Sequence, residues 1–292
     1  MKNIENIKKI VNIVLSHLLE YKEERNINSP KLPKKFRNCV LVKKLQIKNK
    51  STFAVGLYED ENHKLKVLKI WSGKRKNAVY YDLLHEIKTL ETLNKIHLRN
   101  YKKMPKKYMK IKIPKLLEYI DFGNKLIMVT SYCKPVNQNV NSLDKQKNMI
   151  HSAQEFIRYL GNKANKNEKT IISSKNGSIY IAQFFVIIIL AILKRPKYIK
   201  EFLLSIIVFI KGSNDLLYEK NNFLTHGDLN TNNIFKIKNG FAIIDFEQTI
   251  FSFEPLEIAT FISSRRNSKD LVSQILKDFV IYTKHHSLFY SL

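Results

Sequence analysis

Residues 225–235 read Thr-His-Gly-Asp-Leu-Asn-Thr-Asn-Asn-Ile-Phe, and residues 244–247 read Ile-Asp-Phe-Glu. Asp228 in the first stretch is followed five residues later by Asn233, and Asp245 comes twelve residues after Asn233. Two carboxylates and an amide placed together can divide the work of phosphoryl transfer. One carboxylate can take a proton from a hydroxyl, while the second carboxylate and the amide bind Mg²⁺ through their oxygen atoms. This combination predicts a site for phosphoryl transfer.

A β-hairpin is predicted between the two stretches. Residues 234–244 alternate in polarity and turn at Asn239-Gly240, which is a strong hairpin signal. Because a hairpin brings its two ends side by side, we expect Asn233 and Asp245 to be neighbours in space.

The offset between Asp228 and Asn233 also separates the base from the metal-binding Asn in the kinase catalytic-loop pattern H-R-D-x-x-x-x-N. Gly227 takes the place of the Arg. Residues 226–228, Asn233 and residues 244–247 together resemble the aminoglycoside phosphotransferase and choline kinase family, the small-molecule branch of the protein-kinase-like fold. The resemblance implies ATP- and Mg²⁺-dependent transfer of the γ-phosphate to a hydroxyl of a small molecule, a sugar or a lipid-linked saccharide.

The resemblance implies a role for each matched residue. Asp228 is the expected catalytic base, Asn233 and Asp245 are the expected Mg²⁺ ligands, and His226 is the expected structural brace of the loop. Glu247 is left open between helping to hold a second metal ion and hydrogen-bonding within the loop.

Such a site also needs a lysine for the ATP phosphates on an upstream strand. Residues 64–71 favour a β-strand, and its alternation places Val67 and Lys69 on one face. We expect Val67 to cover the adenine and Lys69 to reach the α and β phosphates. Lys66 is the alternative, but it shares its face with Leu68 and has no small apolar neighbour two residues before it.

An acidic partner for this lysine is expected on the helix that follows. Four leucine or isoleucine residues at steps of four, three and three predict that helix: Leu83, Ile87, Leu90 and Leu93. Glu86 occupies the position of the family's helix acid and is the candidate partner in nucleotide binding. Glu91 is the alternative, and we interpret it as a solvated helix acid.

The loop that should cover the phosphates is unusual, because residues 48–52 read Lys-Asn-Lys-Ser-Thr and contain no glycine. This departs from the Gly-rich loop of protein kinases. Ser51 and Thr52, with Lys50, are the candidate phosphate contacts, and a plain surface turn is the alternative.

Asp121-Phe122-Gly123 spells the kinase metal motif but precedes the catalytic loop by more than a hundred residues, whereas the metal Asp must follow that loop. Residues 116–120 and 126–130 are predicted strands with a turn between them, so the motif is interpreted as an ordinary hairpin. Residues 131–133 then form the expected hinge beside the adenine, with Tyr132 as a candidate nucleotide neighbour.

The segment after Asp245 is short. Residues 246–254 leave no room for the activation loop that docks peptides in protein kinases. Residues 255–259 resemble the family's P-x-D-x-A segment, where Glu257 replaces the Asp that braces the catalytic loop. The glycine-free tip and Glu257 leave a nucleotide-binding pseudokinase as an alternative, and an atypical protein kinase is a third.

The length of 292 residues and a hydrophobic content of 44% suit a large core. The predicted fold is α+β and two-lobed, with a small antiparallel-sheet N-lobe and a mainly helical C-lobe. We expect an N-terminal amphipathic helix and linker over residues 1–35. The nucleotide-binding N-lobe would span residues 36–130, and the C-lobe with the catalytic loop, metal site and acceptor site would span residues 131–292.

Two apolar segments, residues 181–193 and 202–210, flank a basic Pro turn and predict a helical hairpin. The first is about thirteen residues long, shorter than the roughly 20 needed to span a bilayer. In the related family, helices inserted before the catalytic loop line the acceptor site. We therefore expect this hairpin to determine which acceptor is bound. Simple core packing is the alternative.

The formal net charge of +26 attracts anions and repels polycations. Thirteen acidic residues lie in residues 134–292, and several of them are already assigned to the site. We therefore expect an acceptor that is neutral or anionic rather than polycationic, such as a sugar, a lipid-linked saccharide or a head-group alcohol.

Basic clusters and cysteines bear on the location of the protein. Lys34-Lys35 and residues 102–108 are candidates for contact with a membrane surface, with solvated lysines as the alternative. No nucleic acid partner is expected. Cys39 and Cys133 have no metal or redox spacing, which favours a reduced, cytoplasmic setting. A peripheral position at the membrane surface is left open.

Overall fold

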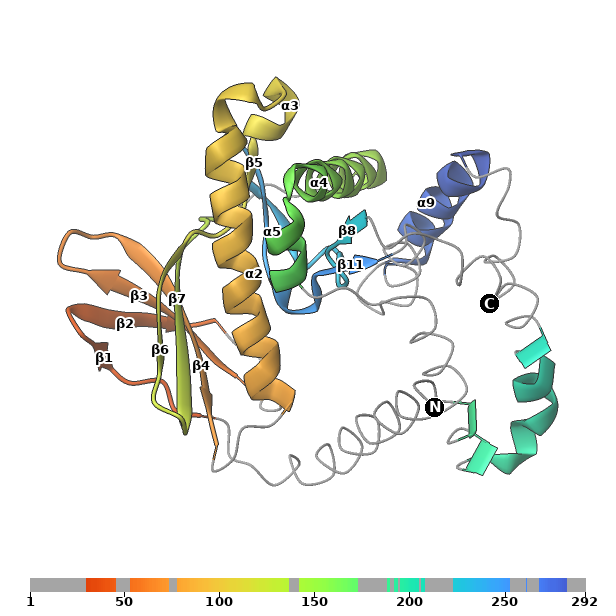
Figure 1. The fold of residues 1–292 in the computed structure, drawn as a ribbon, viewed down its shortest axis with the longest axis horizontal. Coiled ribbons are helices and arrows are strands. Elements are labelled where there is room, and N and C mark those ends of the chain that lie inside the picture. Colours follow the sequence, from red (N-terminus) through yellow and green to blue (C-terminus); the bar gives the residue numbers. More distant parts are fainter. Residues whose placement is uncertain are drawn as a thin grey trace.

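The structure is a computed structural model that describes residues 30–45, 53–73, 78–136, 142–172, 188–189, 192–193, 195–204, 206–207, 223–252, 261 and 268–282. It has a two-lobed, protein-kinase-like α+β fold (Figure 1). An antiparallel sheet forms one lobe, and helices with short strands form the other. The predicted fold class is confirmed.

The N-lobe sheet has six strands in the order β1-β2-β3-β4-β7-β6, and every neighbouring pair is antiparallel. Their bounds are Lys35–Phe36 (β1), Cys39–Lys44 (β2), Ala54–Asp60 (β3), Leu65–Ser72 (β4), Leu116–Asp121 (β6) and Lys125–Ser131 (β7). One face of the sheet buries a separate cluster that includes Tyr58, Leu68 and Ile70. The other face looks toward helix α2.

Helix α2 (Ala78–Asn100) joins the two lobes. Its predicted apolar positions, from Leu83 to Leu93, are buried and confirm the helix. The helix packs against β4, β6 and β7 on one side and against α4, α5 and the turn η4 on the other (Figure 1). A single hydrophobic cluster therefore runs from the sheet into the helical lobe.

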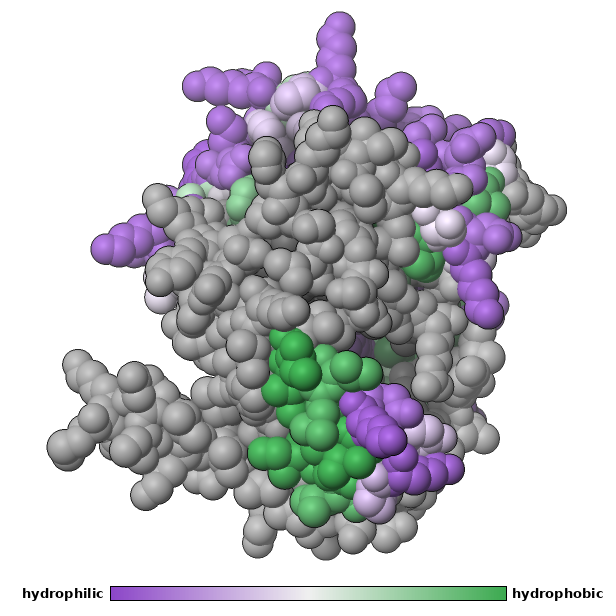
Figure 2. All heavy atoms as spheres, turned by 90° about the vertical axis from the view of Figure 1, so that its right-hand side faces the viewer, coloured by the Kyte–Doolittle hydropathy of each residue, from purple (hydrophilic) through white to green (hydrophobic). Residues whose placement is uncertain are grey.

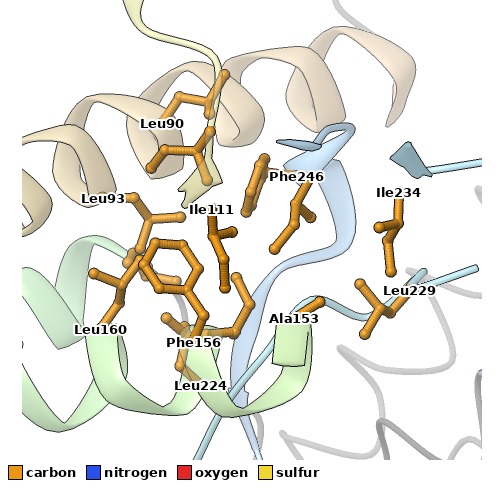
Figure 3. Packing of buried hydrophobic residues seen from close by; sticks show 14 of the residues in the cluster. Leu90, Leu93, Ile111, Ala153, Phe156, Leu160, Leu224, Leu229, Ile234 and Phe246 are labelled. Carbon is orange, nitrogen blue, oxygen red and sulfur yellow. The ribbon is translucent and has the colours of Figure 1, made fainter. Parts of the chain in front are cut away.

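The second lobe contains α4 (Leu143–Lys163), α5 (Lys166–Ile171), α9 (Lys269–Tyr282) and two small sheets. One sheet pairs β5 (Ile111–Lys112), β10 (Gly240–Ile243) and β9 (Ile234–Ile237), and the other pairs β8 (Phe223–Thr225) with β11 (Ile250–Ser252). Short helical turns are η2 (Tyr101–Lys103), α3 (Lys106–Met109), η3 (Pro196–Tyr198) and η4 (Phe246–Gln248). Figure 3 shows how Phe156 and Leu160 of α4 meet Leu93 of α2, with Ile111 and Phe246 beside them.

The predicted hairpin between residues 234 and 244 forms as β9 and β10, but its turn lies one residue earlier than predicted. Gly240 pairs with Ile237, so the loop residues are Lys238 and Asn239. Gly240 has a φ of 133°, and a Cβ there would overlap the carbonyl oxygen of Lys110. This glycine is therefore required by the close approach of the neighbouring chain as much as by the turn.

Residues 122–124 connect β6 to β7, with Asp121 at the end of β6, which confirms the predicted hairpin at this motif. Gly123 has a φ of 81°, and the Tyr80 hydroxyl donates to Asp121 Oδ2 over 2.6 Å. Among the residues that the structure describes, no helix combines the length and the apolar character needed to cross a bilayer. The N-terminal amphipathic stripe lies outside the described residues.

Candidate active site

The loop after β8 holds the Asp228 carboxylate by two amides. Asn230 Nδ2 donates to Asp228 Oδ1 over 2.9 Å, and Asn233 Nδ2 donates to Asp228 Oδ2 over 3.0 Å. The same two amide groups also donate to the Asp228 carbonyl, over 2.9 and 2.8 Å. The carboxylate is therefore fixed in orientation while it stays partly exposed.

Gly227 explains why this loop lacks the Arg of the protein-kinase pattern. Its φ is 79°, a conformation that favours glycine, and a Cβ would overlap the carbonyl oxygen of Gln248. The loop thus lies directly against the segment that follows Asp245, and no side chain fits between them.

His226 connects the loop to the strand that carries Asp245. Its Nε2 donates to the carbonyl oxygen of Ile244 over 3.0 Å, and its Nδ1 accepts from the Asp228 backbone N–H over 3.4 Å. Burial lowers the pKa of His226, so the neutral ring with its hydrogen on Nε2 satisfies both contacts. Its ring centroid lies 4.9 Å from that of Phe246. These are contacts that a structural brace would make.

Asn233 and Asp245 lie at the neighbouring ends of the hairpin. The Ile244 N–H donates to the Asn233 carbonyl over 2.9 Å. Because Asn233 turns its Nδ2 toward Asp228, its amide oxygen faces away from that carboxylate. Asp245 has a φ of 68° and a ψ of 65°, a left-handed backbone conformation that is uncommon outside glycine. Residues in such conformations occur preferentially at functional sites.

Lys69 lies at the centre of an acidic cluster. Its Nζ is 2.8 Å from Glu86 Oε2, 3.1 Å from Asp245 Oδ1 and 3.0 Å from Glu247 Oε2. The same ammonium lies 4.3 Å from the centroid of the Phe53 ring. Burial acts to lower the pKa of Lys69, but the three carboxylates together raise it well above its ordinary value. The lysine is therefore charged at any physiological pH.

The three carboxylates carry more negative charge than one lysine neutralises. Burial raises the pKa of Glu86, against the attraction of Lys69, and burial raises the pKa of Glu247 to about 7. Oxygen atoms of Glu86, Asp245 and Glu247 all lie within 4.8 Å of one another. Carboxylate oxygens are the donors that Mg²⁺ prefers. The residues present fit this ion, with Asp245 and Asn233 as its predicted ligands.

The remaining predicted nucleotide residues are distributed as follows. Val67 is partly buried on β4, two residues before Lys69. Tyr132 follows β7, and its backbone N–H donates to the Leu65 carbonyl over 3.3 Å. Ser51, Thr52 and Glu257 lie outside the described residues. The roles assigned to all of these residues remain predictions.

Lys66 and Glu91, the alternatives to Lys69 and Glu86, lie away from the cluster around Lys69. Lys66 points to the opposite face of β4, where its Nζ lies 3.0 Å from Asp60 Oδ2. Glu91 is exposed on α2 and pairs with Lys95 over 2.8 Å. Neither side chain is part of the cluster around Lys69, so the geometry favours Lys69 and Glu86.

Two polar residues of the site were missed in the sequence. Asn230 is fully buried and orients Asp228, and Thr249 is fully buried beneath the loop. Thr249 Oγ1 donates to the His226 carbonyl over 3.2 Å, and the Thr249 carbonyl accepts from His85 Nε2 over 2.7 Å. A signal existed for Asn230, because an Asn in a loop commonly accepts from the backbone N–H two residues on, as Asn230 Oδ1 does from Asn232. Thr249 gave no comparable signal.

Comparison with known proteins finds similar structures but no similar sequences. No family model matches the chain, and no curated protein matches it significantly. A solved structure that it resembles is a thermostable mutant of aminoglycoside phosphotransferase APH(4)-Ia in a ternary complex with ADP and hygromycin B. The TM-score is 0.57 at 12% identity, over 84% of this chain and 80% of that chain. The chain has the aminoglycoside phosphotransferase fold.

Two further structures of the same phosphotransferase agree. The complex with AMP-PNP and hygromycin B gives a TM-score of 0.56 at 12% identity, over 84% of this chain and 79% of that one. The structure of APH(4)-Ia itself gives a TM-score of 0.53 at 13% identity, over 85% of this chain and 79% of that chain. At this level of identity the likeness establishes the fold alone.

Proposed function

We propose that the protein is an ATP- and Mg²⁺-dependent phosphotransferase that moves the γ-phosphate to a hydroxyl group of a small molecule, a sugar or a lipid-linked saccharide. The observation that carries the proposal is that the structure brings together an oriented carboxylate on the loop after β8 and a buried lysine–glutamate pair. Asp228 is oriented by two amides on one loop, and Asp245 meets the buried Lys69–Glu86 pair beside it. The fold of a phosphotransferase crystallised with ADP and AMP-PNP supports the proposal.

Each residue then has a defined task. Lys69, positioned by Glu86, binds the α and β phosphates. Asp245 and Asn233 would hold Mg²⁺, which supplies charge neutralisation on the phosphates when it is bound. Asp228 takes the proton of the acceptor hydroxyl. At the same time the acceptor oxygen forms a bond to the γ-phosphorus, and the bond between the γ-phosphorus and the ADP oxygen breaks. Lys69 also keeps Glu86 and Glu247 from repelling the phosphates.

The acceptor is proposed to be neutral or anionic. The chain carries a formal net charge of +26, which disfavours a polycation approaching from solution. Among the described residues, the Asp245 and Glu247 carboxylates are already engaged with Lys69. A polyamine would compete with Lys69 for these carboxylates, whereas a neutral sugar would not.

The test is transfer of label from γ-labelled ATP into a cell extract that is then separated into polar small-molecule, lipid-saccharide and protein fractions. Wild type is compared with Asp228→Asn, and Asp121→Asn in the β6–β7 hairpin is the matched control. Label in either of the first two fractions that is lost in Asp228→Asn and kept in Asp121→Asn supports the proposal. Label in protein indicates a protein kinase, and Mg-ATP binding without transfer indicates a pseudokinase.

A further inference from the structure

Large aliphatic side chains are exposed together over residues 188–207. Six of them have exposed fractions between 46% and 74%: Ile189, Leu193, Ile199, Leu203, Leu204 and Ile207. Figure 2 shows apolar surface gathered in the lower part of this face, with hydrophilic side chains directly beside it. We call these six residues the apolar tip. Soluble proteins rarely expose so many large apolar groups in one place without a partner for them.

The helical part of the tip shows that this exposure is patterned. Residues 199–204 and 206–207 are helical, and Ile199, Leu203 and Ile207 recur at every fourth position. Apolar residues at this spacing normally face a protein core. Here all three side chains are exposed, together with Leu204. The stripe is therefore built like a buried helix face but is presented outward.

Basic and aromatic residues interleave with the tip. Arg195, Lys197 and Lys200 are exposed, and Glu201 is the single acid among residues 195–204. Lys197 Nζ lies 4.9 Å from the centroid of the Tyr198 ring. Aliphatic side chains bordered by Tyr, Lys and Arg are the composition of segments that lie in a lipid–water interface. The formal net charge of +26 adds long-range attraction to an anionic surface.

We propose that the apolar tip docks onto an anionic lipid surface. The aliphatic side chains enter the boundary between head groups and acyl chains, and the three basic side chains contact lipid phosphates. A second copy of this chain is a poor occupant, because two tips of the same positive charge would repel each other. This inference is independent of the proposed phosphotransferase activity, since binding to lipid requires neither ATP nor Asp228.

The first experiment is cosedimentation of the full chain with vesicles, without nucleotide. One set of vesicles is pure phosphatidylcholine, and the other contains equal parts of phosphatidylcholine and phosphatidylglycerol. We expect binding to the mixed vesicles and weak binding to the neutral ones. Equal binding to both, or binding to neither, overturns the proposal. Asp228→Asn should bind like wild type, which separates this result from any failure of the enzymatic proposal.

Two sets of variants test the apolar and the basic contributions to lipid binding separately. The double variant Leu203→Asn, Leu204→Asn should weaken binding at least tenfold, whereas Leu98→Asn, which changes a still more exposed leucine on α2, should leave it unchanged. The triple variant Arg195→Gln, Lys197→Gln, Lys200→Gln should weaken binding about a hundredfold, because each basic side chain near an anionic surface contributes roughly fivefold.

The control for charge is Lys102→Gln, Lys103→Gln, Lys106→Gln, which removes three exposed lysines from the other basic cluster. If this control weakens binding as much as the triple variant in the tip, the interaction is one of overall charge and the proposal fails. Circular dichroism confirms that each variant is folded.

A spectroscopic measurement avoids reliance on loss of binding. Trp71 is the single tryptophan of the chain and is buried. In Leu204→Trp, the new indole should shift its emission to the blue on addition of mixed vesicles, and Leu98→Trp should show no shift. A shift that appears at rising protein concentration without lipid would assign the tip to self-association and overturn the proposal.

Discussion

At the scale of single residues, Lys69 is held by three carboxylates, from Glu86, Asp245 and Glu247. Lys69→Met should abolish the thermal stabilisation by Mg-ATP, because it removes the proposed phosphate contact. It should also destabilise the fold by about 3–5 kcal/mol, because Glu86 loses its buried partner. Differential scanning fluorimetry with and without Mg-ATP measures both effects.

The control for this prediction is Lys66→Met, which removes the lysine of the opposite face. It should keep the response to Mg-ATP, since Lys66 pairs with Asp60 away from the site. A double variant, Lys69→Met with Glu86→Gln, should recover part of the lost stability and none of the response. If Lys66→Met were the variant that lost nucleotide binding, the choice of lysine would be wrong.

Asn230 is expected to act through Asp228. Asn230→Ala removes one of the two amides that orient the carboxylate, so kcat should fall roughly 10- to 100-fold while the KM for ATP changes little. Steady-state kinetics on the acceptor found in the labelling experiment give this split. Asn232→Ala, an exposed neighbour in the same loop, should be close to wild type. An equal loss in both variants would mean that the loop as a whole, rather than this amide, had been disturbed.

At the scale of elements, the β9–β10 hairpin depends on a glycine at its contact with the segment before β5. Gly240→Ala should cost about 3 kcal/mol or more, because a Cβ there overlaps the Lys110 carbonyl in addition to the strain of a positive φ. Gly123→Ala is the matched control, since Gly123 also has a positive φ but has open space around its Cα. It should cost only about 1 kcal/mol. Urea unfolding of both variants checks the difference.

The packing of α2 on α4 predicts a pH dependence through His97. Its ring lies 5.9 Å from that of Phe156 between centroids, and burial, helped by Lys112, lowers the pKa of His97. The unfolded chain binds this proton near the ordinary pKa of about 6.5, whereas the folded chain binds it only at lower pH. Stability should therefore fall as the pH drops below about 6.5.

His97→Leu tests this dependence. The variant should flatten the loss of stability between about pH 7 and pH 5, as measured by urea unfolding at a series of pH values. Some dependence should persist because burial lowers the pKa of His226 in the same direction. A slope that His97→Leu does not alter would contradict this assignment.

At the scale of the whole molecule, the site draws on both lobes, because Lys69 and Glu86 belong to the sheet and α2 while Asp245 belongs to the hairpin beyond. A bound nucleotide with its metal should therefore stabilise the complete fold by about 2.7 kcal/mol at a hundredfold excess over Kd. Asp245→Ala should abolish the part of this gain that requires Mg²⁺. Thermal melting with ATP, with and without Mg²⁺, measures it, and a full Mg²⁺-dependent gain in the variant would remove Asp245 from the proposed ligands.

Much of the fold was predictable because the signals are local. The steps from Leu83 to Leu93 fixed the helix, and the alternation over residues 64–71 fixed the strand with Lys69 on the side of Val67. The shift of the hairpin turn to Lys238 and Asn239 was not predictable, because the conformation of Gly240 depends on the approach of residues near Lys110 from far along the chain. The role of Thr249 was hidden for the same reason, since its partners are His226 and His85.

The sequence by itself determined the order and spacing of Asp228, Asn233 and Asp245, because those offsets are set by a short loop and a hairpin whose geometry is encoded locally. Tertiary structure alone decided that Asp245 and Glu247 join the predicted Lys69–Glu86 pair, since they lie 176 and 178 residues from Lys69 along the chain. It also decided that the apolar helix stripe of Ile199, Leu203 and Ile207 would face outward. Burial and long-range charge are properties of the folded molecule, and no local pattern specifies them.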